Sequence, residues 1–169
     1  MIKETNFQKV IKVLSDLPVT ITGIIGILLM IFGSAYAPFG YILLFNSFDI
    51  LGYSKVLRNE EDIKDVETAA YRIMQFLFQL SLLTILLLCY NYIYVISAVV
   101  MHLFGLQDLL YYLVIGEELP EENIHWLRWT PYGAIKHYIF KQDLNKIEFI
   151  IQAVIGTIIS ATITIFQAM

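Results

Sequence analysis

Long apolar segments alternate with shorter polar ones along this chain, and the charged residues gather in three of the polar stretches. These stretches are residues 1–16, 55–72 and 117–148, and only Asp49 and Asp108 carry a charge outside them. A charge at the centre of a bilayer is costly, whereas a helix of about 20 apolar residues satisfies its own backbone polar groups there. The pattern therefore predicts an all-α, polytopic integral membrane helix bundle.

The apolar segments are long enough for about five transmembrane helices. The first segment exceeds one crossing, so we expect it to turn back at Ala37–Gly40, where Pro38 removes a backbone donor. The second long segment is interrupted by the polar sequence Tyr90–Tyr92, where we expect another turn. The second predicted span is short and is compatible with a tilted or partial crossing. The predicted spans are residues 17–37, 38–53, 70–90, 93–115 and 147–167.

Five crossings place all eleven Lys and Arg residues on one side of the membrane. The positive-inside rule makes that side cytoplasmic. We therefore expect a multi-pass protein of the cell membrane, with a cytoplasmic N-terminus and the C-terminus on the opposite side. A four-span arrangement would put part of this charge outside. The 169 residues form a single transmembrane domain, because the spans leave too little chain for a separate soluble one.

Two polar segments are predicted to lie along the membrane surface. In residues 1–16, apolar side chains recur at i, i+3, i+4 and i+7, the spacing of an interfacial amphipathic helix. Residues 117–146 form a cytoplasmic interfacial segment with two candidate helices, Pro120–Trp129 and Pro131–Lys141. Thr130 is placed to cap the second of these helices.

Composition agrees with the membrane class and excludes other classes of function. Hydrophobic residues make up 58% of the chain and charged residues 15%, and the net charge is −4. The basic residues are interspersed with acidic ones, so no basic face indicates a nucleic-acid partner. Cys89 is the only cysteine, which excludes an intramolecular disulfide and a thiolate-rich metal site.

Asp108 and Asp49 are the strongest candidates for function, because a carboxylate inside a transmembrane span is energetically costly and therefore indicates a functional site. They lie about eight and six residues from the cytoplasmic ends of their predicted spans, so the two can share one pocket. His102 is a third candidate, as a secondary base. At 3.6 residues per turn it lies about 120° around the helix from Asp108, so the two do not point to the same place unaided.

Other side chains lie near these acids or at the predicted mouth of the pocket. Arg128, between two tryptophans at the headgroup level, is suited to bind a lipid phosphate or to pair with Glu117. Anchoring in an aromatic belt explains the tryptophans and the arginine as well. The predicted ligand contacts are Asn46, Gln107, Tyr111, Tyr112, Glu117, Trp126, Arg128 and Trp129.

Three hypotheses for the function stay open. The first is a membrane-embedded enzyme or a binding protein for a membrane lipid or another amphipathic small molecule, and the sequence does not decide between these two. The second is an ion- or proton-coupled permease, which at this length would act as an oligomer. The third is a non-catalytic scaffold in which the acids are hydrogen-bonded within the bundle.

The cofactor also stays open. A divalent metal held by Asp49, Asp108 and His102 is one hypothesis, although no HExxH or similar motif sets two ligands on one helix face. Small residues at four-residue steps, such as Gly156 and Ser160, permit close helix packing within the bundle or in a homo-oligomer.

Overall fold

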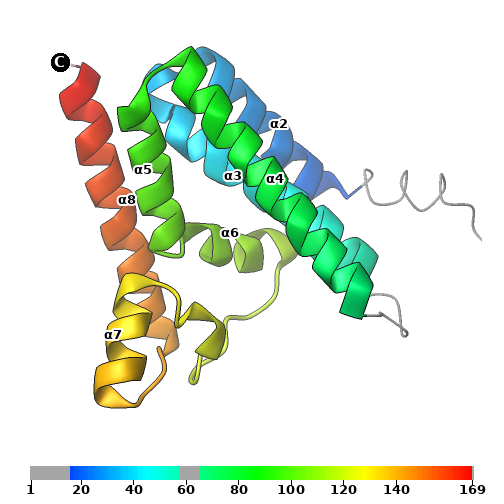
Figure 1. Ribbon diagram of the computed structural model, residues 1–169, viewed down its shortest axis with the longest axis vertical. Coiled ribbons are helices and arrows are strands. Elements are labelled where there is room, and N and C mark those ends of the chain that lie inside the picture. Colours follow the sequence, from blue (N-terminus) through cyan, green and yellow to red (C-terminus); the bar gives the residue numbers. More distant parts are fainter. Residues whose placement is uncertain (1–15, 58–64, 169) are drawn as a thin grey trace, which may run out of the picture.

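The computed structural model describes residues 16–57 and 65–168, and within these ranges it is all-helical, with seven α-helices and no strand. The predicted amphipathic segment 1–16 lies outside the described residues except for Asp16. The helices are α2 (Leu17–Phe32), α3 (Ala37–Asp49), α4 (Asp65–Cys89), α5 (Tyr92–Leu103), α6 (Leu106–Ile115), α7 (Pro131–Phe140) and α8 (Lys146–Ala168) (Figure 1). Short 3-10 turns occupy Ser34–Tyr36 and His125–Leu127, and a π-helix, Ile50–Leu57, extends α3.

Two of the helices are long and apolar enough to cross a membrane. They are Thr68–Cys89 in α4 and Lys146–Gln167 in α8, and α5 with α6 makes a third if the bent pair is counted as one span. The helix Leu17–Phe32 is apolar but shorter. Length and composition of the described helices thus show two or three candidate spans, fewer than the five that the sequence predicts.

The chain reverses between α2 and α3 at Gly33–Tyr36, a few residues before the predicted turn at Ala37–Gly40. Pro38 does not interrupt a helix, because it lies in the first turn of α3. A backbone N–H at that position would have no acceptor within the helix, so its absence in proline costs no hydrogen bond. Gly40 instead lets the helices approach closely. A Cβ added at Gly40 would stand 2.7 Å from the backbone oxygen of Gly26, so only hydrogen fits there.

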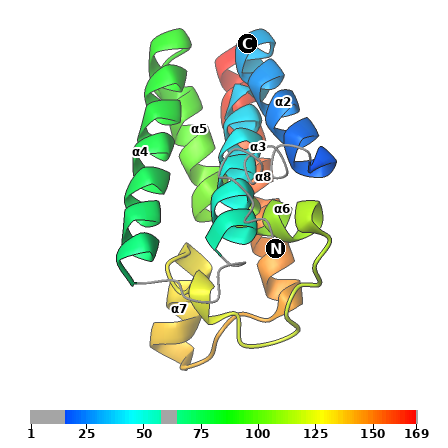
Figure 2. The same ribbon diagram turned by 90° about the vertical axis from the view of Figure 1, so that its right-hand side faces the viewer.

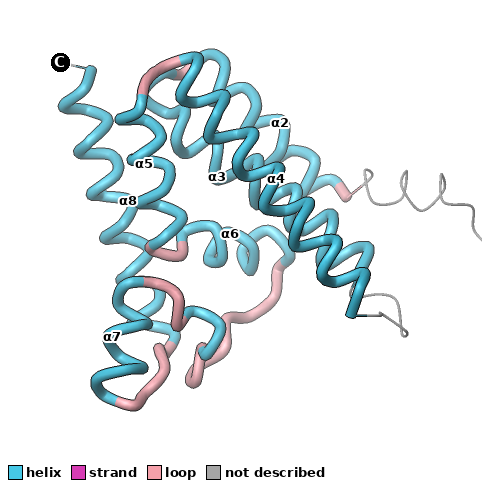
Figure 3. The backbone as a smooth tube through the Cα atoms, in the orientation of Figure 1, coloured by secondary structure: helices cyan, strands magenta, loops and turns pink. Residues whose placement is uncertain are grey.

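The predicted span 93–115 is not one straight helix, because it is broken into α5 and α6, which are bent by 63° from each other. Figure 3 shows the short loop at this break, with α6 running across the bundle from it. Gly105 has a φ of +81°, a left-handed conformation that glycine adopts without a Cβ clash. The carbonyl of Phe104 accepts a hydrogen bond from Nε2 of Gln152 over 3.1 Å, so a side chain of α8 satisfies the backbone at the break.

Small and hydroxyl side chains join α5 to α8. The Ser97 hydroxyl, which is buried, contacts the hydroxyls of Ser160 and Thr164. Gly156 faces Phe104, since a Cβ added there would stand 2.2 Å from the Cβ of Phe104. The four-residue spacing of small residues along α8 therefore serves packing within the chain.

Segment 117–146 contains one of the two helices predicted for it. Helix α7 begins at Pro131, and its Thr130 cap accepts a hydrogen bond from the N–H of Gly133 over 3.3 Å. The predicted helix Pro120–Trp129 is wrong. The N–H of Ile124 instead donates to the carbonyl of Leu144 over 2.9 Å in an isolated antiparallel bridge, which takes this stretch out of helical geometry.

Candidate functional site

A polar cavity of about 240 Å³ lies where α3, α4, α5 and α6 meet. Asp49 and Asp108, the two acids that the sequence analysis singles out, both line it, although they come from different helices. The break after α5 places α6 across the bundle beside α3 and thereby brings Asp108 there (Figure 1). The lining residues are Phe45, Asp49, Arg72, Gln75, Phe76, Gln79, His102, Gln107, Asp108 and Trp129.

Asp49 is held by three hydrogen bonds from two other helices. Its Oδ1 accepts from the Tyr71 hydroxyl over 2.5 Å and from Nε2 of Gln75 over 2.7 Å. Its Oδ2 accepts from Nε2 of Gln107 over 3.0 Å. Three donors satisfy most of the acceptor capacity of a carboxylate, so Asp49 is already committed to holding α3, α4 and α6 together.

Helix α4 supplies a polar face that the sequence analysis missed. Arg72, Gln75 and Gln79 all line the cavity, and Arg72 Nη1 donates to Oε1 of Gln75 over 2.8 Å. The signal was present in the sequence, because these residues recur at i, i+3 and i+7 and so share one side of a helix. In the sequence, Arg72 is the last charge of its stretch, and Gln75 and Gln79 lie within a predicted apolar span.

Asp108 and His102 reach the same cavity because the helix between them is bent. On an unbroken helix they would diverge, whereas the turn at Gly105 redirects α6. Oδ2 of Asp108 and Nδ1 of His102 are both buried and have no hydrogen-bond partner among the described residues. The imidazole of His102 packs against Phe45 and Trp129, with ring centroids 5.5 Å apart in each case.

Six of the eight predicted ligand contacts do not line the cavity, namely Asn46, Tyr111, Tyr112, Glu117, Trp126 and Arg128. Tyr111 packs its ring against Tyr112, which in turn stacks on Trp126 at 6.2 Å, and none of the three lines the cavity. Glu117 is exposed, and its N–H donates to the carbonyl of Tyr112 over 3.2 Å.

Asn46 is fully buried but is not a lining residue either. Both of its side-chain polar atoms have no hydrogen-bond partner in the part of the chain that the structure describes. Gln107 and Trp129, by contrast, lie at the cavity as predicted contacts.

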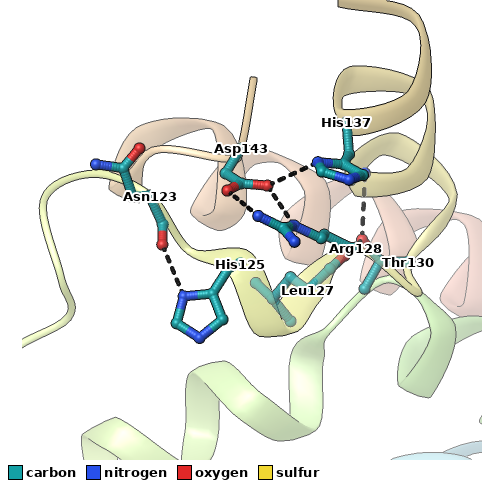
Figure 4. A network of polar contacts seen from close by, with 8 residues as sticks. Asn123, His125, Leu127, Arg128, Thr130, His137 and Asp143 are labelled. Atoms are coloured by element: carbon teal, nitrogen blue, oxygen red, sulfur yellow. Dashed lines mark hydrogen bonds and ion pairs between the residues drawn. The ribbon is translucent and has the colours of Figure 1, made fainter. Parts of the chain in front are cut away.

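Arg128 has a different partner from the one predicted. It forms a bidentate ion pair with Asp143, with N–O distances of 2.7 and 2.6 Å, rather than a pair with Glu117 (Figure 4). Nδ1 of His137 lies 3.2 Å from the same carboxylate. The hydrogen bonds from Arg128 hold the pKa of Asp143 below its usual value. This pair fixes the loop before α7 to the loop after it.

The described residues offer no group of three His, Cys, Asp or Glu side chains that could hold a metal ion. The cavity therefore combines two carboxylates, one guanidinium, three carboxamides and an imidazole without a metal-binding cluster in the described ranges. This set can bind a small polar or charged group through hydrogen bonds. Comparison with protein-family models, with curated proteins and with solved structures finds no match to this chain.

Proposed function

We propose that the chain is a multi-pass membrane protein whose cavity binds the polar head of an amphipathic ligand. The observation that carries this proposal is the buried Oδ2 of Asp108, which has no hydrogen-bond partner among residues 16–57 and 65–168. An unpaired ionised carboxylate is costly in a medium of low dielectric. A ligand that brings a hydrogen-bond donor or a cation removes that cost.

The mouth of the cavity supports an amphipathic ligand. Phe76 and Trp129, which both line the cavity, are 62% and 46% exposed. Next to Phe76, helix α4 exposes the large apolar side chains of Ile73, Leu77 and Leu80. A polar head in the cavity would leave an apolar tail against this face of α4, within the hydrocarbon layer.

The arrangement we propose in the membrane has five crossings, with α5 and α6 together as one broken span. The turn Gly33–Tyr36, the turn at Asn91 and the end of α8 lie at one end of the molecule, and α7 lies at the other (Figure 2). Broken helices are tolerated in a membrane where they line a cavity. The basic residues of segment 117–146 make the α7 end cytoplasmic, so the cavity opens toward the inner leaflet.

The test is identification of the bound ligand. The full-length protein is purified from membranes in a mild detergent, and native mass spectrometry detects molecules that stay bound. We expect an amphipathic ligand on the wild type, its loss from Asp108→Asn, and its retention by the control Glu122→Gln, an exposed carboxylate outside the cavity. Absence of any such ligand from the wild type, or equal retention by Asp108→Asn, would contradict the proposal. Chemical conversion of the bound ligand over time would make the protein an enzyme.

Proton-coupled transport by an oligomer is the second candidate. The observation that favours it is the pair of buried, unpartnered proton carriers at one cavity, Oδ2 of Asp108 and Nδ1 of His102. A proton relay predicts acidification of proteoliposomes under a pH gradient, measured with an internal pH-sensitive dye. It also predicts loss of that flux in Asp108→Asn but not in Glu122→Gln.

A further inference from the structure

The charges and hydrogen bonds of the cavity narrow the chemistry of the head group. Resting on the function proposed above, we infer that the ligand carries a primary ammonium group, which Asp108 and His102 bind. The inference depends on the groups that are already paired in the cavity and on those that are left.

Asp49 and Arg72 are already linked to each other. Arg72 donates to Gln75, and Gln75 donates in turn to Asp49, so one carboxamide bridges the guanidinium and the carboxylate. Tyr71 and Gln107 complete the hydrogen bonding of Asp49. Asp108 is the second carboxylate of the cavity and has no such bridge. The bridge places Asp49 and Arg72 together as one acidic and one basic group, which leaves Asp108 as the carboxylate with which a cationic group of a ligand can pair.

Two polar atoms of the cavity have no partner among the described residues, Oδ2 of Asp108 and Nδ1 of His102. A carboxylate oxygen accepts hydrogen bonds, and Nδ1 of a neutral imidazole accepts in the tautomer that has its proton on Nε2. A primary ammonium has three donors and can satisfy both atoms at once. A guanidinium ligand would bring five donors in a rigid planar fork, more than these two acceptors use.

A quaternary ammonium fits this site less well. It has no N–H to donate and is bound through the faces of aromatic rings. Phe45 and Trp129, two aromatic residues that line the cavity, already pack against the imidazole of His102. The site thus distinguishes an ammonium that donates hydrogen bonds from a methylated one.

Two phospholipids that differ only in the methylation of the head-group nitrogen provide the test. The full-length protein, depleted of bound lipid, is mixed at neutral pH with equal amounts of phosphatidylethanolamine and phosphatidylcholine with identical acyl chains, and retained lipid is measured by native mass spectrometry. We expect phosphatidylethanolamine to be retained about tenfold more, as for the loss of one charge-assisted hydrogen bond. Asp108→Asn should lose this preference, and Glu122→Gln should keep it.

A second pair of probes separates the ammonium from the phosphate. Dodecylamine should displace the bound phospholipid, whereas dodecyltrimethylammonium at the same concentration should not. Equal retention of the two phospholipids by the wild type, or equal displacement by the two amphiphiles, would overturn the assignment of a primary ammonium while leaving a lipid-binding cavity. Failure of the wild type to retain any lipid would instead overturn the proposed function itself.

Discussion

Nε2 of Gln107 donates a hydrogen bond to Oδ2 of Asp49 over 3.0 Å, and this contact joins the short helix α6 to α3. The other oxygen of the same carboxylate accepts from Tyr71 and Gln75 on α4. A single side chain therefore connects three helices that are distant in the sequence. Asp49 consequently has a structural role that its partner across the cavity, Asp108, does not share.

Replacing Asp49 should destabilise the bundle more than replacing Asp108. We expect Asp49→Ala to lower the free energy of unfolding in detergent by about 1–3 kcal/mol, because three donors lose their acceptor. A double-mutant cycle with Gln107→Ala should give a coupling energy of about 0.5–1.5 kcal/mol. Strictly additive effects of the two substitutions would show that the Gln107 contact contributes no stability.

The close approach of α2 and α3 should make Gly40 intolerant of any side chain. A Cβ at Gly40 would stand 2.7 Å from the oxygen of Gly26 and 2.8 Å from the nitrogen of Met30, so the helices must separate. We expect Gly40→Ala to cost about 1–3 kcal/mol in unfolding measured by SDS titration. Gly23→Ala is the matched control, because its Cβ would meet Ser47 at 3.4 Å, an ordinary contact. Similar losses for both variants would contradict the packing argument.

Gln152 should be required for the break between α5 and α6. It donates to the carbonyl of Phe104 and accepts from the Thr130 hydroxyl over 3.2 Å, so Gln152→Leu removes both hydrogen bonds. The Phe104 carbonyl loses this donor, whereas the Thr130 hydroxyl keeps the Leu127 carbonyl as acceptor. We expect a loss of about 1–3 kcal/mol in unfolding free energy. Gln142 is exposed, so Gln142→Leu should change the free energy of unfolding by less than about 0.5 kcal/mol. A loss as large as that of Gln152→Leu would show that the effect is not specific to Gln152.

The ion pair of Arg128 and Asp143 should make segment 117–146 sensitive to acid. The ordinary pKa of the carboxyl is 3.8, and the hydrogen bonds from Arg128 lower it in the folded protein. The stabilisation is therefore complete above pH 3.8 and is lost as the pH falls through the lowered pKa of Asp143. Tryptophan fluorescence of Trp126 and Trp129 should follow this loss. Asp143→Asn should abolish that transition, and a transition unchanged in the variant would assign it to another group.

The proposed orientation can be tested by labelling single cysteines in the Cys89→Ala background. Tyr36 lies in the turn between α2 and α3 and is 65% exposed, whereas Glu122 is exposed in segment 117–146. A maleimide that does not cross membranes should label Tyr36→Cys on intact cells and Glu122→Cys only after permeabilisation. Labelling of both on intact cells would rule out the five-crossing arrangement.

Local signals in the sequence predict the ends of several helices. Asn91 follows the polar interruption of the second apolar segment, and the structure has a turn there, with the Asn91 side chain accepting from the N–H of Ile93 over 2.8 Å. The helix that begins at Pro131 with a Thr130 cap is also present. Each of these features depends on residues within a few positions of one another, so the sequence alone is sufficient to predict it.

Features that depend on distant partners are not predictable in this way. Phe104 and Gly105 read as part of a continuous apolar span, because nothing nearby shows that Gln152, 48 residues later, satisfies the Phe104 carbonyl. The placement of the acids is an intermediate case. The sequence predicts a similar depth for them from the predicted spans, but their position at one cavity with Arg72 and Gln75 depends on the 63° bend.

The contacts of Asp49 also have a consequence for biosynthesis. Its donors Tyr71, Gln75 and Gln107 follow it by 22, 26 and 58 residues, so the ribosome makes the acid before any group that binds it. When α3 leaves the ribosome, the Asp49 carboxylate therefore has none of these hydrogen-bond donors. The contacts can stabilise the position of α3 in the bundle only after α4 and α6 have been made.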